Sequence, residues 1–298
     1  MRRLPNVGRG LSRAIRGAVV RALAVALSVA VTISVSSCSA TTDSQTLPQG
    51  PAIPVGITVD EPGVSLEHDG VYSGFDVTVA RYVAGVLGYG QSQIVFVPVT
   101  VGNASRELES GTVDMVFSAL PADSETRSGW EYVGPYLSAS QGLMVRVRDK
   151  KTITDSSSLG GRQVCVVEGS GAADVIRQKS PGAVISTRSS YKKCLTALMV
   201  GQADAVAGDG AVLSGLVRSE GAGLVTMSSW TYGSSPHAVV IRGSSTELAR
   251  TIRTALVRMI RDGSWAKAYA TLRKDTGYRT GSSLDKDHIE IHRSSVSS

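Results

Sequence analysis

Several features that define common classes of protein are scarce in this chain of 298 residues. Aromatic residues make up only 5% and charged residues 19%, whereas 42% are hydrophobic, a balance typical of globular chains rather than disordered ones. The apolar stretch Ala22–Val35 has 14 residues, fewer than the ~20 that a membrane-spanning helix requires. The length allows one large domain or two medium lobes with a sizeable core.

Motifs for covalent or metal-dependent catalysis are missing as well. The chain has no G-x-S-x-G, no H-E-x-x-H and no C-x-x-C, and its four histidines are scattered. An enzyme would have to work with carboxylates, arginine and backbone amides alone. We therefore expect neither a metal site nor a cofactor, and binding rather than catalysis.

The positive charge is confined to one end of the chain. The formal net charge is +6, but residues 1–37 contain six arginines and no acidic residue, so the remainder is close to neutral. A basic patch for nucleic acid would require the excess charge to lie on the folded part. We expect no nucleic-acid partner.

The first 37 residues resemble a bacterial lipoprotein signal peptide. The basic segment is followed by the apolar stretch Ala22–Val35 and by Val35-Ser36-Ser37-Cys38, which is similar to a lipobox. Cleavage would leave Cys38 to carry lipid, with residues 38–50 as a polar, flexible linker. The alternative is ordinary cleavage beside an incidental cysteine.

With Cys38 assigned to lipid, Cys165 and Cys194 remain as an even pair in an exported chain. A disulfide is the default interpretation in an oxidising compartment, and two free thiols are the alternative. Closing this loop would stabilise the fold by roughly 3–4 kcal/mol.

From residue 51 onward, short apolar strands alternate with amphipathic helices, which predicts mainly parallel sheets with crossover helices. Residues 149–161 (DKKTITDSSSLGG) are typical of a boundary, after which a second set of alternating elements begins. The pattern predicts two α/β lobes with a cleft between them. The Ser-rich residues 281–298 are expected to be disordered.

The segment Gly201–Gly215 contains the strongest candidate for a binding residue. A short strand ends at Gly208-Asp209-Gly210 and a helical run follows, which places Asp209 at the carboxyl end of a strand. Ligands bind at this edge of open α/β sheets. Asp209 could equally cap the helix.

A second candidate, Gly169-Ser170-Gly171, also lies between a strand and a helix. Its backbone amides could bind a small anion at the positive end of the helix, or the segment could be a plain tight turn. A zwitterion needs such a site, with an acid for its ammonium and an arginine such as Arg127 for its carboxylate.

Five runs of sequence, in this order, resemble the amino-acid-binding lipoproteins of ABC importers, most closely the glutamate/glutamine type. They are Tyr72-Ser73-Gly74-Phe75-Asp76-Val77, Gly111-Thr112-Val113-Asp114, Val133-Gly134-Pro135-Tyr136, Gln202-Ala203-Asp204-Ala205-Val206 and Ile260-Arg261-Asp262-Gly263-Ser264-Trp265. The resemblance covers residues 57–272. The cysteine pair is also similar to that of actinobacterial glutamate-binding relatives.

The resemblance implies a periplasmic-binding-protein-like type II fold, in which two Rossmann-like α/β lobes are joined by two hinge strands. Lobe 1 would span residues 51–145, lobe 2 residues 146–232, and residues 233–280 would return to lobe 1. The chain would cross between the lobes near Met144–Arg148 and Trp230–Val239.

The resemblance also implies a set of ligand contacts. Asp209 would bind the α-ammonium group of the ligand, and Arg127 its α-carboxylate. From the second lobe, Ser170 and Gly171 would act as donors. From the first lobe, Ser118 and Ala119 would contribute backbone groups. The residues expected near the ligand side chain are Asp60 and Asn103.

The chain departs from the family pattern in three places. The loop before Arg127 is one residue out of register, and Pro121 replaces a threonine and has no N–H to donate. Val167 stands where some relatives have a side-chain donor, and Gly63 where some have an aromatic ring. These departures make the carboxylate contact less secure than the ammonium contact.

The resemblance favours a monomeric, lipid-anchored protein on the outer face of the cell membrane. It would bind a polar amino acid, glutamate or glutamine, by hinge closure and deliver it to the permease subunits of an ABC importer. The alternatives are an amino-acid sensor that signals to a membrane partner and, less favoured, a dehydratase-like enzyme on the same fold.

Overall fold

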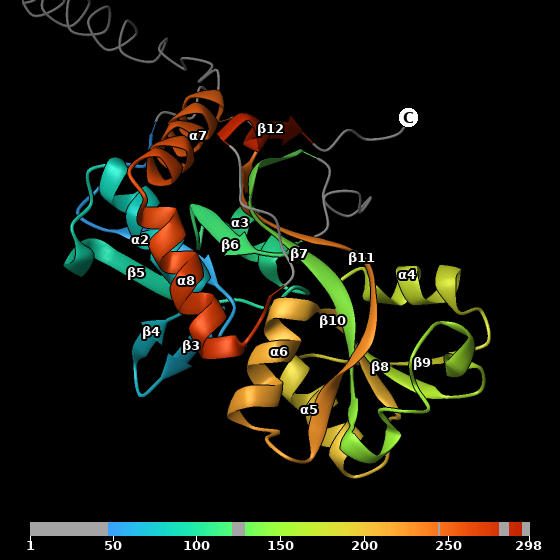
Figure 1. The fold of residues 1–298 in the computed structure, drawn as a ribbon. Helices are drawn as coiled ribbons and strands as arrows, with labels where there is room; N and C mark the ends of the chain where they lie inside the picture. Colours follow the sequence, from blue (N-terminus) through green and yellow to red (C-terminus); the bar gives the residue numbers. More distant parts are fainter. Residues whose placement is uncertain (1–46, 121–128, 244, 280–285, 294–298) are drawn as a thin grey trace, which may run out of the picture. The chain divides into compact units, whose positions relative to one another are not determined.

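The computed structural model describes residues 47–120, 129–243, 245–279 and 286–293 (Figure 1). The expected lipidation site Cys38, the loop residue Pro121 and the expected clamp residue Arg127 lie outside these ranges. Among the described residues, no helix is long and apolar enough to cross a membrane.

One half of the main sheet is built from three parallel strands. They are β1 (Ile53–Ile57), β5 (Ile94–Pro98) and β6 (Met115–Ser118), with β1 between the other two. The helices α2 (Phe75–Val86) and α3 (Ala104–Glu109) lie on the connections between these strands. Parallel strands need such crossover connections, and this half forms the first α/β lobe.

The other half repeats this arrangement. Its parallel strands are β8 (Gln163–Val167), β9 (Val184–Arg188) and β10 (Ala205–Asp209), with β8 in the middle. Its helices are α4 (Ala172–Lys179), α5 (Tyr191–Met199) and α6 (Gly210–Ser219). The expected second α/β lobe is therefore present.

Two long antiparallel strands, β7 (Trp130–Arg146) and β11 (Val225–Arg242), connect the halves in the order β5-β1-β6-β11-β7-β10-β8-β9. On β11, Ala238–Val240 pairs with β6 of the first lobe, which agrees with the expected crossing. On β7, Gln141–Val145 already pairs with β10 of the second lobe, so the crossing precedes Met144–Arg148. The predicted crossing lies too far toward the C-terminus because the apolar run that ends β7 belongs to the core of the second lobe.

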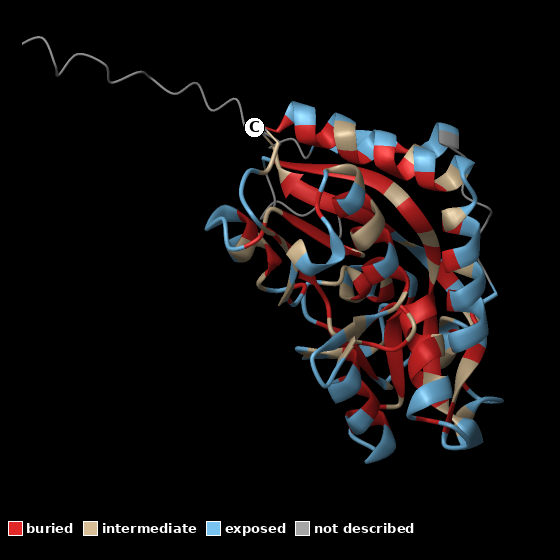
Figure 2. Cartoon of the chain, turned by 90° about the vertical axis from the view of Figure 1, so that its left-hand side faces the viewer, coloured by how far each residue is buried: buried red, intermediate tan, exposed pale blue. Residues whose placement is uncertain are grey.

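The C-terminal helices α7 (Thr246–Arg261) and α8 (Ser264–Thr276) pack against α2 of the first lobe, and α8 also contacts α6. The apolar side of α7, including Leu248, Ile252 and Met259, is buried, and its arginines face outward. The buried residues line the sheet and the inner faces of the helices (Figure 2). Burial of one apolar helix stripe is the main source of such packing energy.

A small sheet follows β1. It consists of β2 (Asp60–Glu61), β3 (Ser65–His68) and β4 (Val71–Ser73), paired antiparallel in that order. Short 3₁₀ turns occur at Gln91–Gln93, Val147–Asp149 and Ser157–Leu159. The small sheet matters for the site because β2 holds Glu61 a few residues after the carboxyl end of β1.

The expected disulfide is present. Cys165 on β8 and Cys194 on α5 are bonded, with their Cα atoms 5.6 Å apart, inside the ~4.4–6.8 Å that disulfides require. Both cysteines are fully buried. The bond ties a strand of the second lobe to the helix that covers it.

Part of the C-terminal tail is ordered, contrary to the expectation of disorder over residues 281–298. Lys286–His288 forms a 3₁₀ turn, and β12 (Glu290–Arg293) pairs with β7. Ile289 is fully buried, its carbonyl accepts a hydrogen bond from Arg253 on α7, and Arg293 forms an ion pair with Glu131. These contacts join residues that are distant in the sequence, so the Ser-rich composition alone could not predict the structure of this segment.

Candidate functional site

The junction between β10 and α6 has the predicted geometry. Asp209 ends the strand, and its Oδ1 accepts hydrogen bonds from the N–H groups of Ala211 and Val212, at 2.8 and 3.0 Å. The helix cap is therefore formed. Gly208 is required here because a Cβ atom would lie 2.5 Å from the ring of Tyr191, whose hydroxyl accepts a hydrogen bond from the Asp209 N–H.

The second oxygen of Asp209 belongs to a buried charge cluster. His237 on β11 lies between two carboxylates, with Nδ1 3.1 Å from Asp76 Oδ2 and Nε2 3.1 Å from Asp209 Oδ2. A carboxylate only accepts hydrogen bonds, so contacts at both ring nitrogens require the doubly protonated imidazolium. The cluster joins α2 of the first lobe, the long strand β11 and the N-terminus of α6.

The pKa shifts in this cluster follow from opposing effects. Burial lowers the pKa of His237, but the attraction of Asp76 and Asp209 outweighs it and raises this pKa well above 6.5. Burial likewise raises the pKa of Asp209, but His237 and the helix N–H of Val212 bring it below 3.8. Asp209 is thus a buried carboxylate that stays ionised at neutral pH.

Glu61 on β2 is a second buried carboxyl group near Asp209. Its Oε2 accepts hydrogen bonds from the hydroxyl groups of Thr58 and Ser65, at 2.8 and 3.3 Å. Burial, followed by repulsion from Asp76, raises the pKa of Glu61 to about 7. Its other oxygen, Oε1, has no hydrogen-bond partner among the described residues.

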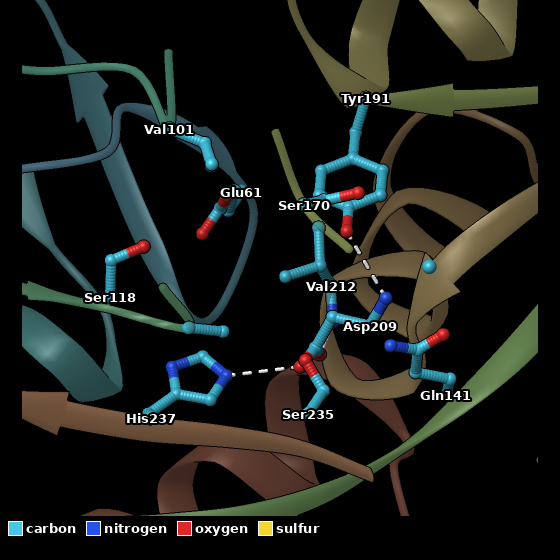
Figure 3. A pocket seen from close by; sticks show the side chains of 12 residues that line it. Glu61, Val101, Ser118, Gln141, Ser170, Tyr191, Asp209, Val212, Ser235 and His237 are labelled. Atoms are coloured by element: carbon cyan, nitrogen blue, oxygen red, sulfur yellow. Dashed lines mark hydrogen bonds and ion pairs between the residues drawn. The ribbon is translucent and has the colours of Figure 1, made fainter. Parts of the chain in front are cut away.

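These residues surround one small pocket (Figure 3). In the view of Figure 3, Glu61, Ser118 and His237 lie on one side, and Asp209 and Tyr191 on the other. The complete lining is Glu61, Val101, Ser118, Ala119, Gln141, Ser170, Tyr191, Gly208, Asp209, Val212, Ser235 and His237. These residues come from both lobes and from the strands that connect them.

The pocket is nearly filled by its own side chains. Its free volume is about 10 Å³, which is room for about one water molecule. A larger ligand therefore requires the residues that line the pocket to move apart.

Four of the expected site residues lie together at this pocket: Asp209, Ser118, Ala119 and Ser170. Asp60 lines an adjoining cavity that shares Glu61 and Tyr191 with the pocket. Asn103 is engaged elsewhere, because its Oδ1 accepts a hydrogen bond from the Thr100 N–H at the start of α3. Gly171 begins α4 with φ of 73° and does not line the pocket.

Five polar pocket residues were missed by sequence reasoning: Glu61, Gln141, Tyr191, Ser235 and His237. Glu61 was detectable, since it follows Asp60 directly after the first strand. His237 gave no local signal, because its partners are 28 and 161 residues away in the chain. Within the described ranges, no group of three or more His, Cys, Asp or Glu side chains is placed to hold a metal ion.

Comparison with protein families gives a match over most of the chain. Residues 53–272 match the bacterial extracellular solute-binding proteins, family 3. The chain is similar to the ABC transporter glutamine-binding protein GlnH of Bacillus subtilis, with 27% identity over 208 residues, 70% of this chain and 75% of that protein. It is also 27% identical over 224 residues to the glutamate-binding protein GluB of Corynebacterium efficiens, covering 72% and 76% of the two chains.

Solved structures agree on the fold. The amino acid ABC transporter substrate-binding protein AbpA of Streptococcus pneumoniae, bound to L-arginine, superposes with a TM-score of 0.67 at 20% identity, covering 77% of this chain and 97% of that one. An ancestral arginine-binding protein bound to glutamine gives 0.69 at 24% identity, with 78% and 100% covered. At these identities the structures establish the shared two-lobed fold.

Proposed function

Because the chain belongs to family 3 of the bacterial extracellular solute-binding proteins, we propose that it is the binding component of an ABC importer for a polar amino acid, glutamine or glutamate. It would bind the amino acid in the pocket at Asp209 and present it to the permease subunits. The observation that carries this proposal is a buried aspartate of lowered pKa in a polar pocket lined from both lobes.

Asp209 is the proposed contact for the α-ammonium group. Its Oδ2 faces His237, and a carboxylate oxygen can accept a second hydrogen bond. Two aspartates share a single imidazolium, so the cluster of Asp76, Asp209 and His237 has one negative charge in excess. A cation at the Asp209 side of the pocket would neutralise that charge.

The ligand carboxylate is proposed to lie between Arg127 and the N-terminus of α4, where Ser170 and Gly171 are found. Ser118 and Ala119 would contribute polar contacts from the carboxyl end of β6, and Asp60 would act from the adjoining cavity. The names of the relatives support an amino acid as ligand, since GlnH is called glutamine-binding and GluB glutamate-binding.

We propose ligand capture without chemical turnover. Binding would close the two lobes around the amino acid, and contacts from the second lobe would stabilise the closed form. The lining of the pocket by residues of both lobes supports this closure.

The N-terminal part of the chain is proposed to anchor the protein. Cys38 would carry lipid on the outer face of the cell membrane, and residues 38–50 would form the linker to a monomeric binding body. Cells that express Cys38→Ala are expected to release the protein into the soluble fraction. Retention of this variant in the membrane fraction would rule out the anchor.

Titration calorimetry with the twenty amino acids tests the proposed function. We expect at least one polar amino acid to bind, and the same ligand to raise the unfolding temperature. At ligand concentrations of about 100 times Kd, the stabilisation is about 2.7 kcal/mol. If no amino acid produces heat or raises the unfolding temperature, the proposal is wrong.

A further inference from the structure

Two oxygen atoms of the pocket residues lack hydrogen-bond donors among the described residues, and one of the two is fully buried. The buried one is Oε1 of Gln141, whose Nε2 donates to the Ser234 carbonyl. The other is Oε1 of Glu61, which lines the pocket, whereas Oε2 accepts the bonds from Thr58 and Ser65. Glu61 and Gln141 are both more than nine-tenths buried. Buried acceptors without partners are costly, so a ligand that brings donors would be favoured here.

The Glu61 carboxyl group is held in position through one of its two oxygens. Thr58 and Ser65 donate to Oε2, and their own hydroxyl groups are 2.5 Å apart. Figure 3 shows Glu61 beside Ser118, opposite Tyr191 and Val212. Oε1 is therefore held in place before a ligand arrives, which lowers the entropic cost of a contact.

The groups around Glu61 supply excess negative charge. Asp76 on α2 and Asp209 on β10 repel its ionised form, while His237 on β11 attracts it. The hydroxyl groups of Tyr136 on β7 and Tyr191 on α5 also interact with Glu61, and both have pKa values raised well above 10 by burial and nearby carboxylates.

From this geometry, and on the basis of the proposed function, we infer that Glu61 determines the ligand specificity of the pocket. Its free oxygen accepts hydrogen bonds from a ligand side chain that ends in N–H donors, such as the amide of glutamine or the guanidinium of arginine. A ligand side chain that ends in a carboxylate is rejected. The α-ammonium and the side chain of the ligand would thus meet two different carboxyl groups, Asp209 and Glu61.

Glutamine and glutamate form the sharpest test, because they have nearly the same shape and differ only in whether the side chain ends in an N–H donor or in a carboxylate. At pH 8 we expect the wild-type protein to bind glutamine or arginine more tightly than glutamate in titration calorimetry. Glu61→Gln should lower the affinity for the preferred ligand by about 10- to 100-fold, the effect usually seen when a hydrogen bond to a charged group is lost. The same variant should bind glutamate as well as the wild type does, or better.

Glu109→Gln is the matched control, since Glu109 is exposed at the end of α3 in the same lobe. It should leave all three affinities unchanged. Absence of binding by all three amino acids to the wild type would overturn the proposed function, and this inference with it. If the wild type binds glutamate at least as tightly as glutamine and arginine, or if Glu61→Gln weakens all three equally, the inference alone is overturned.

The pH dependence of the wild-type protein gives a test that requires no variant. The pKa of Glu61 is about 7, so its ionised fraction rises about tenfold between pH 6 and pH 8. The affinity for arginine, which stays charged over this range, should rise by about the same factor. The affinity for glutamate should fall. An arginine affinity that is constant between pH 6 and pH 8 would contradict the inferred role.

Discussion

Asp209 and Glu61 line the same pocket and are similarly buried, with 2% and 8% of their surface exposed. Their pKa values nevertheless move in opposite directions, below 3.8 for Asp209 and up to about 7 for Glu61. Burial raises the pKa of both groups. The difference comes from their partners, since Asp209 has an imidazolium and two backbone N–H groups in addition to the Ser235 hydroxyl, whereas Glu61 has two neutral hydroxyl groups.

This difference assigns complementary tasks to the two carboxyl groups. Asp209 is compensated by His237 and remains charged at all physiological pH values, which suits a permanent contact for an ammonium group. Glu61 is close to its titration midpoint at neutral pH, so its charge responds to the ligand. One end of the pocket would thus hold the group common to all amino acids, and the other would distinguish among their side chains.

The largest expected effect comes from removing the imidazolium of His237, the hydrogen-bond partner that Asp209 has and Glu61 lacks. His237→Phe should lower the free energy of unfolding by about 3–5 kcal/mol, because Asp76 and Asp209 would stay buried without their shared partner. Urea denaturation measures this loss. His68→Phe is the control, since His68 is exposed on β3. A loss below about 1 kcal/mol, the usual value for exposed pairs, would show that the imidazolium does not compensate the aspartates.

The next effect is a pH dependence of stability that Glu61 alone causes. The folded-state pKa of Glu61 is raised from 4.5 to about 7, so its stabilising contribution is complete below pH 4.5 and is lost as the pH rises through 7. The shift corresponds to roughly 3 kcal/mol between pH 4.5 and pH 8. In urea denaturation, the free energy of unfolding of Glu61→Gln should therefore change over this pH range by that much less than the free energy of unfolding of the wild type.

His237 is present in both proteins and contributes to both pH profiles. Its pKa is also raised, so its contribution is complete below pH 6.5 and is lost only at higher pH, above its folded-state value. Identical pH profiles for the wild type and Glu61→Gln would mean that Glu61 is ionised in the fold like an ordinary glutamate.

A third variant separates the cap of α6 from the charge of Asp209. Asn caps helices as well as Asp does, so Asp209→Asn should keep the cap but lose the negative charge and the hydrogen bond that Oδ2 accepts from His237. We expect the affinity for the amino acid to fall by about 10- to 100-fold in calorimetry. Asp174→Asn, at an exposed position of α4, should have no effect. An unchanged affinity for Asp209→Asn would remove Asp209 from the ammonium site.

The smallest expected effect concerns the hydroxyl groups that hold Glu61. The hydrogen bond from the Thr58 hydroxyl to Oε2 lowers the pKa of Glu61, and Thr58→Val removes that bond. The pKa should therefore rise further above 7, and stability should fall by about 1 kcal/mol. Carboxyl NMR titration and urea denaturation measure the two changes. Thr187→Val, at an exposed position of β9, is the control, and an equal pKa of Glu61 in both variants would contradict the assigned contact.

Local sequence patterns were sufficient to predict much of the fold. Alternating strands and helices predicted both lobes, the Gly208-Asp209-Gly210 junction predicted the start of α6, and the cysteine pair predicted the disulfide. Each of these follows from short-range chemistry: turn residues, helix capping, and the redox state of exported chains.

The electrostatics of the site could not be predicted in the same way. The cluster of Asp76, Asp209 and His237 joins three elements that meet only in the folded chain. The early crossing of β7 and the pairing of β12 likewise depend on tertiary contacts. The position of Arg127 and the lipid on Cys38 remain predictions, because both residues lie outside the described ranges.

Carboxyl NMR titration of the unliganded protein tests the contrast between Asp209 and Glu61 most directly. Signals labelled at the carboxyl carbons can be assigned by their loss in Asp209→Asn and Glu61→Gln. We predict a midpoint at about pH 7 for Glu61 and one below 3.8 for Asp209. A Glu61 midpoint near the ordinary 4.5, or an Asp209 midpoint above 3.8, would contradict the account.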